Sequence, residues 1–137
     1  MTRALPLKRG LLDTSVFIAL EQGRELDYGS LPLEQLVSVI TRAELFAGVH
    51  AARSADVRAI RLSTIESLAG FDILSANSAA ATRWGELRHA VSAAGRRANV
   101  NDLWIAGIAL ANHLPVVTQG NDFDVIAKLS DLTIIKV

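Results

Sequence analysis

The sequence of 137 residues contains no cysteine and only three histidines. Without cysteine, the chain can form no disulfide, no thiolate zinc site and no cysteine nucleophile. A histidine-rich metal site is also not expected. Fourteen basic residues balance fourteen acidic residues. This balance excludes a strongly cationic coat for nucleic acid but allows a local basic surface.

Long apolar runs and glycine-rich motifs are missing as well. No stretch of about 18 uncharged apolar residues occurs, so no membrane-spanning helix and no membrane partner are predicted. Asp13 interrupts the apolar run over residues 11–20, and no small-residue cleavage signature follows, so a signal peptide is not expected. No G-x-G-x-x-G motif follows the first predicted strand, which disfavours a hydride-transfer enzyme. A cytoplasmic location is therefore the expectation.

Half of the residues are hydrophobic, which is enough to form the core of a single domain over residues 1–137. Short apolar runs alternate with longer helical patterns. Strands are predicted at residues 10–13, 36–40, 71–74, 115–118 and 132–137. Helices are predicted at residues 14–20, 41–52, 54–68, 78–94, 101–111 and 123–129. This alternation predicts the α/β class, with a mainly parallel sheet of about five strands covered by helices on both faces.

Acidic residues follow the ends of the predicted strands. Asp13 ends the first strand, Glu44 lies one turn into the helix after the second, and Asp102 begins a later helix. Asp122 and Asp124 follow the fourth strand. In parallel sheets, functional residues collect outside the carboxyl ends of the strands. We therefore expect these acids to meet at one edge of the sheet.

Several carboxylates in apolar surroundings raise one another's pKa and are costly to bury. A divalent cation removes both costs. Since the available ligands are oxygens, Mg²⁺ is the expected ion, and Mn²⁺ is expected to substitute for it. Such an ion can activate water and stabilise a phosphoryl transition state.

Each acid taken alone has a simpler interpretation. Asp13, Asp102 and Asp122 could cap the helices that follow them. Glu44 could complete a capping box with Thr41. Only the joint placement of these residues at strand ends favours a shared site.

The order and spacing of four motifs resemble PIN-domain nucleases, and more narrowly the VapC toxins of bacterial toxin–antitoxin pairs. The motifs are residues 12–18 (LDTSVFI), 38–45 (SVITRAEL), 101–106 (NDLWIA) and 114–119 (LPVVTQ). The resemblance implies a three-layer α/β/α fold and a Mg²⁺-dependent endoribonuclease that hydrolyses RNA with metal-activated water. It also implies a homodimer that a VapB-type antitoxin inhibits.

The same resemblance assigns catalytic and metal-binding roles to Asp13, Glu44 and Asp102, with Asp122 as the fourth acid. Many relatives carry an acid or Asn two positions after the Thr that ends the fourth strand, where this chain has Gly120. Asp122 or Asp124 could therefore be the fourth acid. Asp122 is close enough to the end of the fourth strand for its loop to fold back toward the other acids, which favours Asp122. We expect Phe123 to be buried and to fix the direction in which Asp122 points.

Neighbouring polar residues could support this site. Thr14 and Ser15 could hydrogen-bond Asp13 or a metal-bound water, Asn101 could hold Asp102, and Thr118 could orient the fourth acid. Ordinary roles in helix starts, caps and strand ends are the alternatives.

Arginines near the acids could contact RNA. Arg96 and Arg97 lie on the loop before Asp102 and could reach phosphates, although solvated surface is the alternative. Arg53, Arg58 and Arg61 are expected on a solvent-exposed helix face.

Two other functions remain open at this point. A receiver-like phosphoacceptor domain has a similar size and α/β pattern, but it needs paired acids after its first strand and an acceptor Asp near mid-chain. Here Asp72 falls inside the third predicted strand. A catalytically inactive PIN-like binding module, whose acids are only caps, is the second alternative. A metal titration separates this module from the nuclease.

Overall fold

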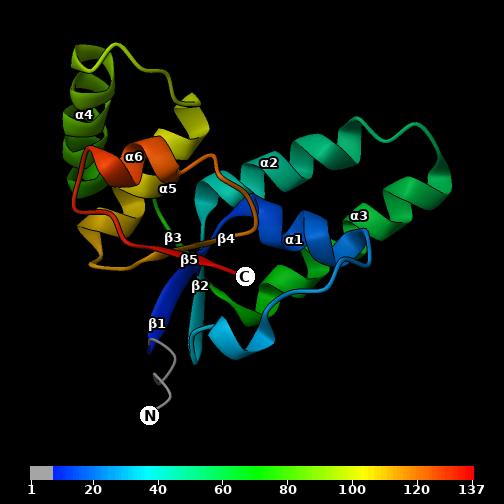
Figure 1. Ribbon diagram of the computed structural model, residues 1–137. Coiled ribbons are helices and arrows are strands. Elements are labelled where there is room, and N and C mark those ends of the chain that lie inside the picture. The colour runs from blue at the N-terminus through cyan, green and yellow to red at the C-terminus, as the bar shows by residue number, and fades with distance from the viewer. Residues whose placement is uncertain (1–7) are drawn as a thin grey trace.

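Five parallel strands form a single sheet in the computed structural model, which describes residues 8–137 (Figure 1). The strands are β1 (Arg9–Leu12), β2 (Glu34–Ser38), β3 (Asp72–Leu74), β4 (Val116–Thr118) and β5 (Ile134–Lys136). Their order across the sheet is β3-β2-β1-β4-β5. The prediction of a mainly parallel sheet of about five strands is confirmed.

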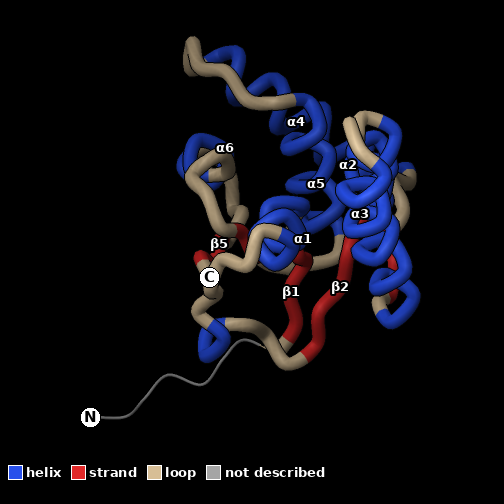
Figure 2. Tube along the Cα trace, turned by 90° about the vertical axis from the view of Figure 1, so that its right-hand side faces the viewer, coloured by secondary structure: helices blue, strands red, loops and turns tan. Residues whose placement is uncertain are grey.

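Helices cover both faces of this sheet. They are α1 (Thr14–Glu21), α2 (Val39–His50), α3 (Ala55–Ser67), α4 (Ser78–Ala93), α5 (Val100–Ala111) and α6 (Asp124–Lys128), with 3₁₀ turns at Tyr28–Ser30 and Leu68–Gly70. Figure 1 shows α4, α5 and α6 on one side of the strands, and the turned view of Figure 2 shows α1 and α3 in front of them. The fold is therefore a three-layer α/β/α sandwich. No helix within residues 8–137 has the length and apolar character that a membrane span needs.

The central strands are buried on both faces because successive side chains point in opposite directions. In β1, Leu11 belongs to the core under α4, α5 and α6, and Leu12 belongs to the core under α1 and α2. Val116 and Val117 of β4 divide between the two cores in the same way. These apolar strands hold their carboxyl ends at one edge of the sheet.

The start of α2 differs from the sequence prediction. The structure ends β2 at Ser38 and begins the helix at Val39, whereas we expected the strand to run to residue 40. The hydroxyl of Ser38 accepts a hydrogen bond from the backbone N–H of Thr41 at 3.2 Å. This N-cap outweighs the strand preference of Val39 and Ile40. The alternative interpretation of Thr41 and Glu44 as a capping box is therefore wrong.

The start of α5 also differs. Asn99 is the N-cap, and its side chain accepts a hydrogen bond from the backbone N–H of Asn101 at 2.8 Å. Asp102 therefore lies in the first turn of the helix, where an acid interacts favourably with the helix dipole. The helix therefore begins one residue before the predicted start at 101, and the alternative role of Asp102 as its cap is wrong. The correction leaves the Asp102 carboxylate free for other contacts.

Close packing of α4 on α5 depends on Gly107. A Cβ atom at this position would lie 2.9 Å from the carbonyl oxygen of Ala80 and 3.3 Å from the backbone nitrogen of Trp84. We expect Gly107→Ala to lower the free energy of unfolding by about 1–3 kcal/mol, because the helices must move apart. Urea denaturation measures this change. Gly85→Ala is the matched control on α4, since nothing lies within 4 Å of its Cβ. It should be neutral or stabilising, and equal losses in both variants would contradict the packing argument.

Candidate active site

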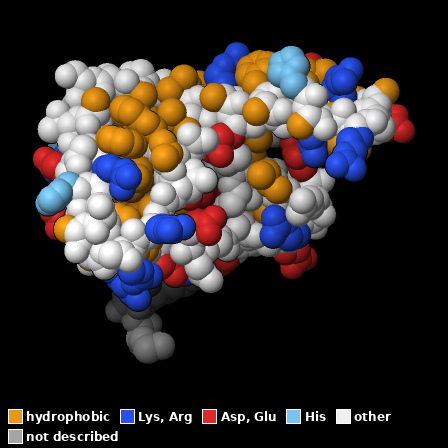
Figure 3. Space-filling model, turned by 90° about the horizontal axis from the view of Figure 1, so that it is seen from above, with side chains coloured by type: hydrophobic (Ala, Val, Ile, Leu, Met, Phe, Trp, Pro, Cys, Tyr) orange, Lys and Arg blue, Asp and Glu red, His pale blue; other side chains and the backbone are white. Residues whose placement is uncertain are grey.

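Four carboxylates meet at the carboxyl edge of the sheet. Asp13 directly follows β1, Asp122 lies in the loop after β4, Glu44 is on α2 and Asp102 is on α5. All four line one hollow of about 180 Å³, and the last three also line an adjoining hollow of about 400 Å³. We call these two hollows the acidic cleft. Seen from above, acidic side chains lie in the hollowed centre of this face, with basic side chains around it (Figure 3).

Asp13 is buried and held in one orientation. Its carboxylate accepts hydrogen bonds from the backbone N–H of Ser15 at 3.1 Å, the Ser15 hydroxyl at 2.6 Å and the Thr118 hydroxyl at 2.9 Å. Burial raises the pKa of Asp13, and these hydrogen bonds oppose the rise. Ser15 contacts Asp13 as expected. Thr118 orients this first acid, whereas we expected it to orient the fourth.

Glu44 is held by Thr14 from the neighbouring helix. The Thr14 hydroxyl donates to Oε1 of Glu44 at 2.7 Å and lies 3.0 Å from Oγ1 of buried Thr41. We expected Thr14 to contact Asp13, but the N-terminal turn of α1 directs it to α2 instead. The contact sets the direction of Glu44 toward the cleft.

Asp102 experiences the charge of the whole cluster. Burial, followed by the charges of Asp122, Glu44 and Asp13, raises the pKa of Asp102 to about 7. An acid in this position releases its proton more readily when a cation is nearby. The cleft therefore has the electrostatic character of a cation site.

The donor set fits a hard divalent cation that retains water ligands. Within residues 8–137, no group of three His, Asp or Glu side chains forms a ready-made ligand cluster. Mg²⁺ does not require one, because it usually keeps several waters and binds proteins through one or two carboxylates. The structure thus supplies oxygen donors and excess negative charge, but not a closed cage.

Asp122 and Asp124 point to different surroundings. Asp122 lines the acidic cleft, whereas Asp124 forms an ion pair with Lys136, with 3.0 Å between Nζ and Oδ1. Between them, Phe123 is 1% exposed and anchors the segment in the core, as predicted. The short helix α6 has no side-chain cap, so capping is not the role of Asp122.

We therefore expect Asp122→Ala to weaken Mn²⁺ binding by about 10-fold or more, because it removes an oxygen donor and a charge from the cleft. Asp124→Ala should leave the affinity within about 2-fold, since Lys136 already neutralises that carboxylate. Isothermal titration calorimetry measures both. A loss only in Asp124→Ala would show that the other acid is the ligand.

The remaining predicted residues differ in their relation to the cleft. Arg96 and Arg97 are both exposed, and only Arg97 lines the larger hollow. Asn101 is exposed, and its hydrogen bond in the described structure is made by its backbone N–H. The expected contact from Asn101 to Asp102 is therefore not formed.

Sequence reasoning missed several residues near the site, among them Ile18 and Arg61. Ile18 lines the acidic cleft one helical turn after Thr14, a spacing that could have indicated it. Arg61 lines a pocket that adjoins the cleft, although it lies on α3, far along the chain. No local signal in the sequence points to Arg61.

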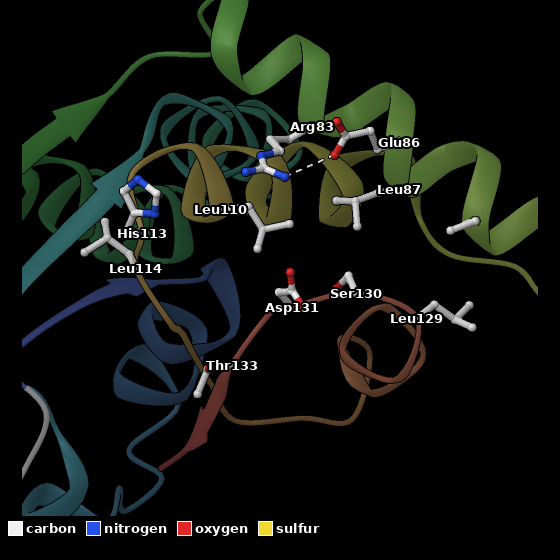
Figure 4. A pocket seen from close by; sticks show the side chains of 11 residues that line it. Arg83, Glu86, Leu87, Leu110, His113, Leu114, Leu129, Ser130, Asp131 and Thr133 are labelled. Atoms are coloured by element: carbon white, nitrogen blue, oxygen red, sulfur yellow. Dashed lines mark hydrogen bonds and ion pairs between the residues drawn. The ribbon is translucent and has the colours of Figure 1, made fainter.

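A larger cavity, of about 600 Å³, lies away from the acids (Figure 4). Its lining includes Arg83 and Glu86 of α4, which form an ion pair at 3.2 Å, and His113, Asp131 and Thr133 from the segments before β4 and β5. These segments precede the strands, so this cavity is at the amino edge of the sheet. It shares no lining residue with the acidic cleft.

Comparisons with known proteins agree with this architecture. The PIN domain matches residues 10–129. Ribonuclease VapC5 of Mycobacterium tuberculosis is 46% identical over 128 residues, which is 93% of this chain and 95% of that protein. Ribonuclease VapC4 of the same organism is 36% identical, over 93% of this chain and 98% of that protein.

Solved structures give the same result. The structure of the toxin–antitoxin system VapBC-5 from Mycobacterium tuberculosis has a chain with a TM-score of 0.88 and 43% identity, covering 95% of this chain and 99% of that one. VapBC2 from Rickettsia felis, bound to a promoter DNA fragment, has a TM-score of 0.80 at 23% identity, covering 94% and 98%. The similarity to VapBC2 from Rickettsia felis shows a shared fold alone.

Proposed function

Because the chain belongs to the PIN-domain family, we propose that it is a VapC-type toxin, an endoribonuclease that hydrolyses RNA phosphodiester bonds and is inhibited by a VapB-type antitoxin. Identity of 46% to a named ribonuclease over most of both chains supports this activity. The observation that carries it is the convergence of Asp13, Glu44, Asp102 and Asp122 in one cleft.

The order of the strands excludes the receiver-like alternative. Receiver domains have the sheet order 2-1-3-4-5, whereas this chain has 3-2-1-4-5. The inactive binding module has the same fold as the nuclease, so only an activity measurement separates the two.

Mg²⁺ is the proposed cofactor, with Mn²⁺ as its substitute, and one or two of the four cleft carboxylates, with water as the other ligands, would hold it. When bound, the ion would lower the pKa of a coordinated water and stabilise charge on the phosphate. The protein's part is to orient the donors. Ser15 and Thr118 fix the Asp13 carboxylate, and Thr14 fixes Glu44. Without the ion, the pKa of about 7 lets the Asp102 carboxylate hold a proton near neutral pH.

Arg97 lines the cleft beside Asp102 and Asp122, where its guanidinium group can contact a phosphate of the incoming RNA. No such position supports the same role for Arg96. The negative charge of the acids attracts the cation, and the positive charge of Arg97 attracts the phosphodiester. Both components must meet in the cleft.

The proposed partners are a second copy of the chain and the antitoxin. Leu20 and Ile60 are exposed apolar residues that line a shallow hollow between α1 and α3, of about 390 Å³. Exposed apolar surface of this kind suits an interface. We also propose that the protein acts in the cytoplasm, where RNA is available. Light scattering of the purified chain, alone and with antitoxin, measures both assemblies.

Cleavage of an RNA pool by the purified chain tests the function. We expect cleavage with Mg²⁺, none with excess chelator, and recovery when Mn²⁺ exceeds the chelator. A folded protein that binds antitoxin but cuts no RNA with either ion would be the inactive module. Cleavage that persists in chelator would contradict the role of the metal.

A further inference from the structure

A pocket of about 320 Å³ adjoins the acidic cleft between α1, α2 and α3. We call it the side pocket. Ile18 and Leu45 form its apolar wall, and Glu21, Gln22 and Arg61 contribute polar groups. Thr14, Ile18 and Glu44 line both the side pocket and the cleft, so the two spaces adjoin along these residues.

We call the cleft and the side pocket together the trough. Arg97 lies at one end, among the residues that line the larger hollow of the cleft. Arg61 lines the side pocket at the other end, and all four acids line the hollow that adjoins both ends. A trough with cations at both ends and a proposed metal site in the middle suits a strand of linked phosphates.

Arg61 has unused hydrogen-bonding capacity. The sequence predicted an exposed position for it, but the structure places it half-buried, while Arg53 and Arg58 are exposed as expected. Its Nη1 donates to the carbonyl oxygen of Gly48 at 2.5 Å. Within residues 8–137 no carboxylate forms an ion pair with it. A guanidinium has five N–H donors, so several remain for a ligand.

The side chain of Arg61 packs close to the α2 backbone at Gly48. A Cβ atom on Gly48 would lie 3.9 Å from Cδ of Arg61, which is ordinary contact distance. The arginine side chain thus lies against the α2 backbone with its charge held at the pocket. A half-buried cation without an ion pair is a favourable place for an anion.

We propose that Arg61 binds the phosphate of a nucleotide adjacent to the one that is cut, and that the side pocket receives that nucleotide's base against Ile18 and Leu45. This inference rests on the proposed ribonuclease function. The carboxylates of Glu21 and Glu44 also line the pocket, so they would repel a free phosphate. Occupancy therefore requires a longer single strand that is already anchored in the cleft.

Arg61→Gln tests the contact, with Arg58→Gln as the control. Both residues are on α3 and both changes remove one positive charge, but Arg58 is exposed and does not line the trough. On a single-stranded RNA of about 12 nucleotides, we expect Arg61→Gln to raise KM about 10-fold with kcat within about 2-fold. The dependence of log affinity on log salt should also become shallower by about 0.7, the value for one phosphate contact. Arg58→Gln should change neither.

A scan of the RNA separates direct contact from a structural role for Arg61. Oligonucleotides carry one neutral methylphosphonate at successive linkages beside the cut. With the wild-type protein, one linkage should show about 10-fold weaker binding, and Arg61→Gln should lose sensitivity at that linkage only. Arg61→Lys, which retains the charge without the planar fork, should restore part of the effect.

An unchanged salt dependence and linkage profile in folded Arg61→Gln would overturn the inference. So would weaker antitoxin binding with unchanged RNA binding, because the pocket would then belong to a protein partner. If Arg61→Gln does not fold, the absence of any sensitive linkage in the wild-type scan overturns it. Failure of the wild-type protein to cut RNA contradicts the proposed function instead, and the binding scan still reports on Arg61.

Discussion

Asp13→Asn and Asp102→Asn are each expected to reduce RNA cleavage by at least about 100-fold, the scale seen when one preorganised charge-stabilising group is lost. Asparagine keeps the volume of the side chain but removes the charge that would hold the metal. At position 13 it also remains a good N-cap for α1, so the fold should persist. Initial cleavage rates at saturating Mg²⁺, with circular dichroism as the check on folding, measure the effect.

Asp124→Asn is the matched control. It makes the same change of charge near the site, but the Asp124 side chain pairs with Lys136 and does not line the cleft. Its cleavage rate should stay within about 2-fold of the wild type, as for other surface ion pairs. A folded Asp13→Asn or Asp102→Asn that cuts RNA at the normal rate would show that the acid is structural.

In the absence of metal, Asp102→Asn is expected to raise the melting temperature above pH 7. The pKa of Asp102 is raised to about 7 by burial and by the neighbouring acids. The folded state therefore holds this proton more tightly than the unfolded state, where the pKa is about 3.9. The contribution of protonated Asp102 to the free energy of unfolding is fully present below pH 4 and is lost as the pH rises from about 4 to 7. The variant has no such loss.

Asp102 is only partly buried, so solvent screening reduces the penalty of its ionised form to about 1–2 kcal/mol. This corresponds to roughly 3–8 °C for a chain of this size. Thermal unfolding in chelator from pH 4.5 to 8.5 should show a difference that grows up to pH 7 and is then constant. A difference that does not vary with pH would argue against repulsion at Asp102. Mg²⁺ should stabilise the wild type more than the variant, because only the wild type retains all its donors.

Asp13→Asn should not give the same gain. Repulsion alone predicts stabilisation in both variants, but Asp13 accepts three hydrogen bonds from Ser15 and Thr118. An amide can accept only through its oxygen, so at least one of these bonds would weaken. The two acids therefore differ in what holds them, although they face the same cleft.

The local pattern of residues was sufficient to predict the sheet and the place of the acids. All five predicted strands are present, although Val39 and Ile40 belong to α2, and Asp13, Glu44, Asp102 and Asp122 lie at the carboxyl edge of the sheet as expected. For Asp13, Glu44 and Asp122 the parallel fold explains this convergence, because each follows a strand and the strands end at the same edge. Asp102 follows α4 and a loop, so its position depends on how α5 packs. The burial of Phe123 likewise followed from the apolar pattern around it.

Helix starts were less predictable because neighbouring residues compete for the same role. Ser38 and Thr41 could both cap α2, and Asn99 and Asn101 could both cap α5. Which residue takes the cap depends on where the preceding strand or loop ends, and that is a property of the sheet register.

The sequence by itself determined the α/β alternation, the family resemblance and the set of acids, since these depend on residues within a few positions of one another. Only the tertiary structure decided which side chains form hydrogen bonds with one another around the site. Thr14 reaches Glu44, Thr118 reaches Asp13, and Arg61 reaches the Gly48 carbonyl. These pairs are separated by 30, 105 and 13 residues. Such contacts depend on how helices pack on the sheet, because a side chain's neighbours across elements follow from packing directions that no local pattern encodes.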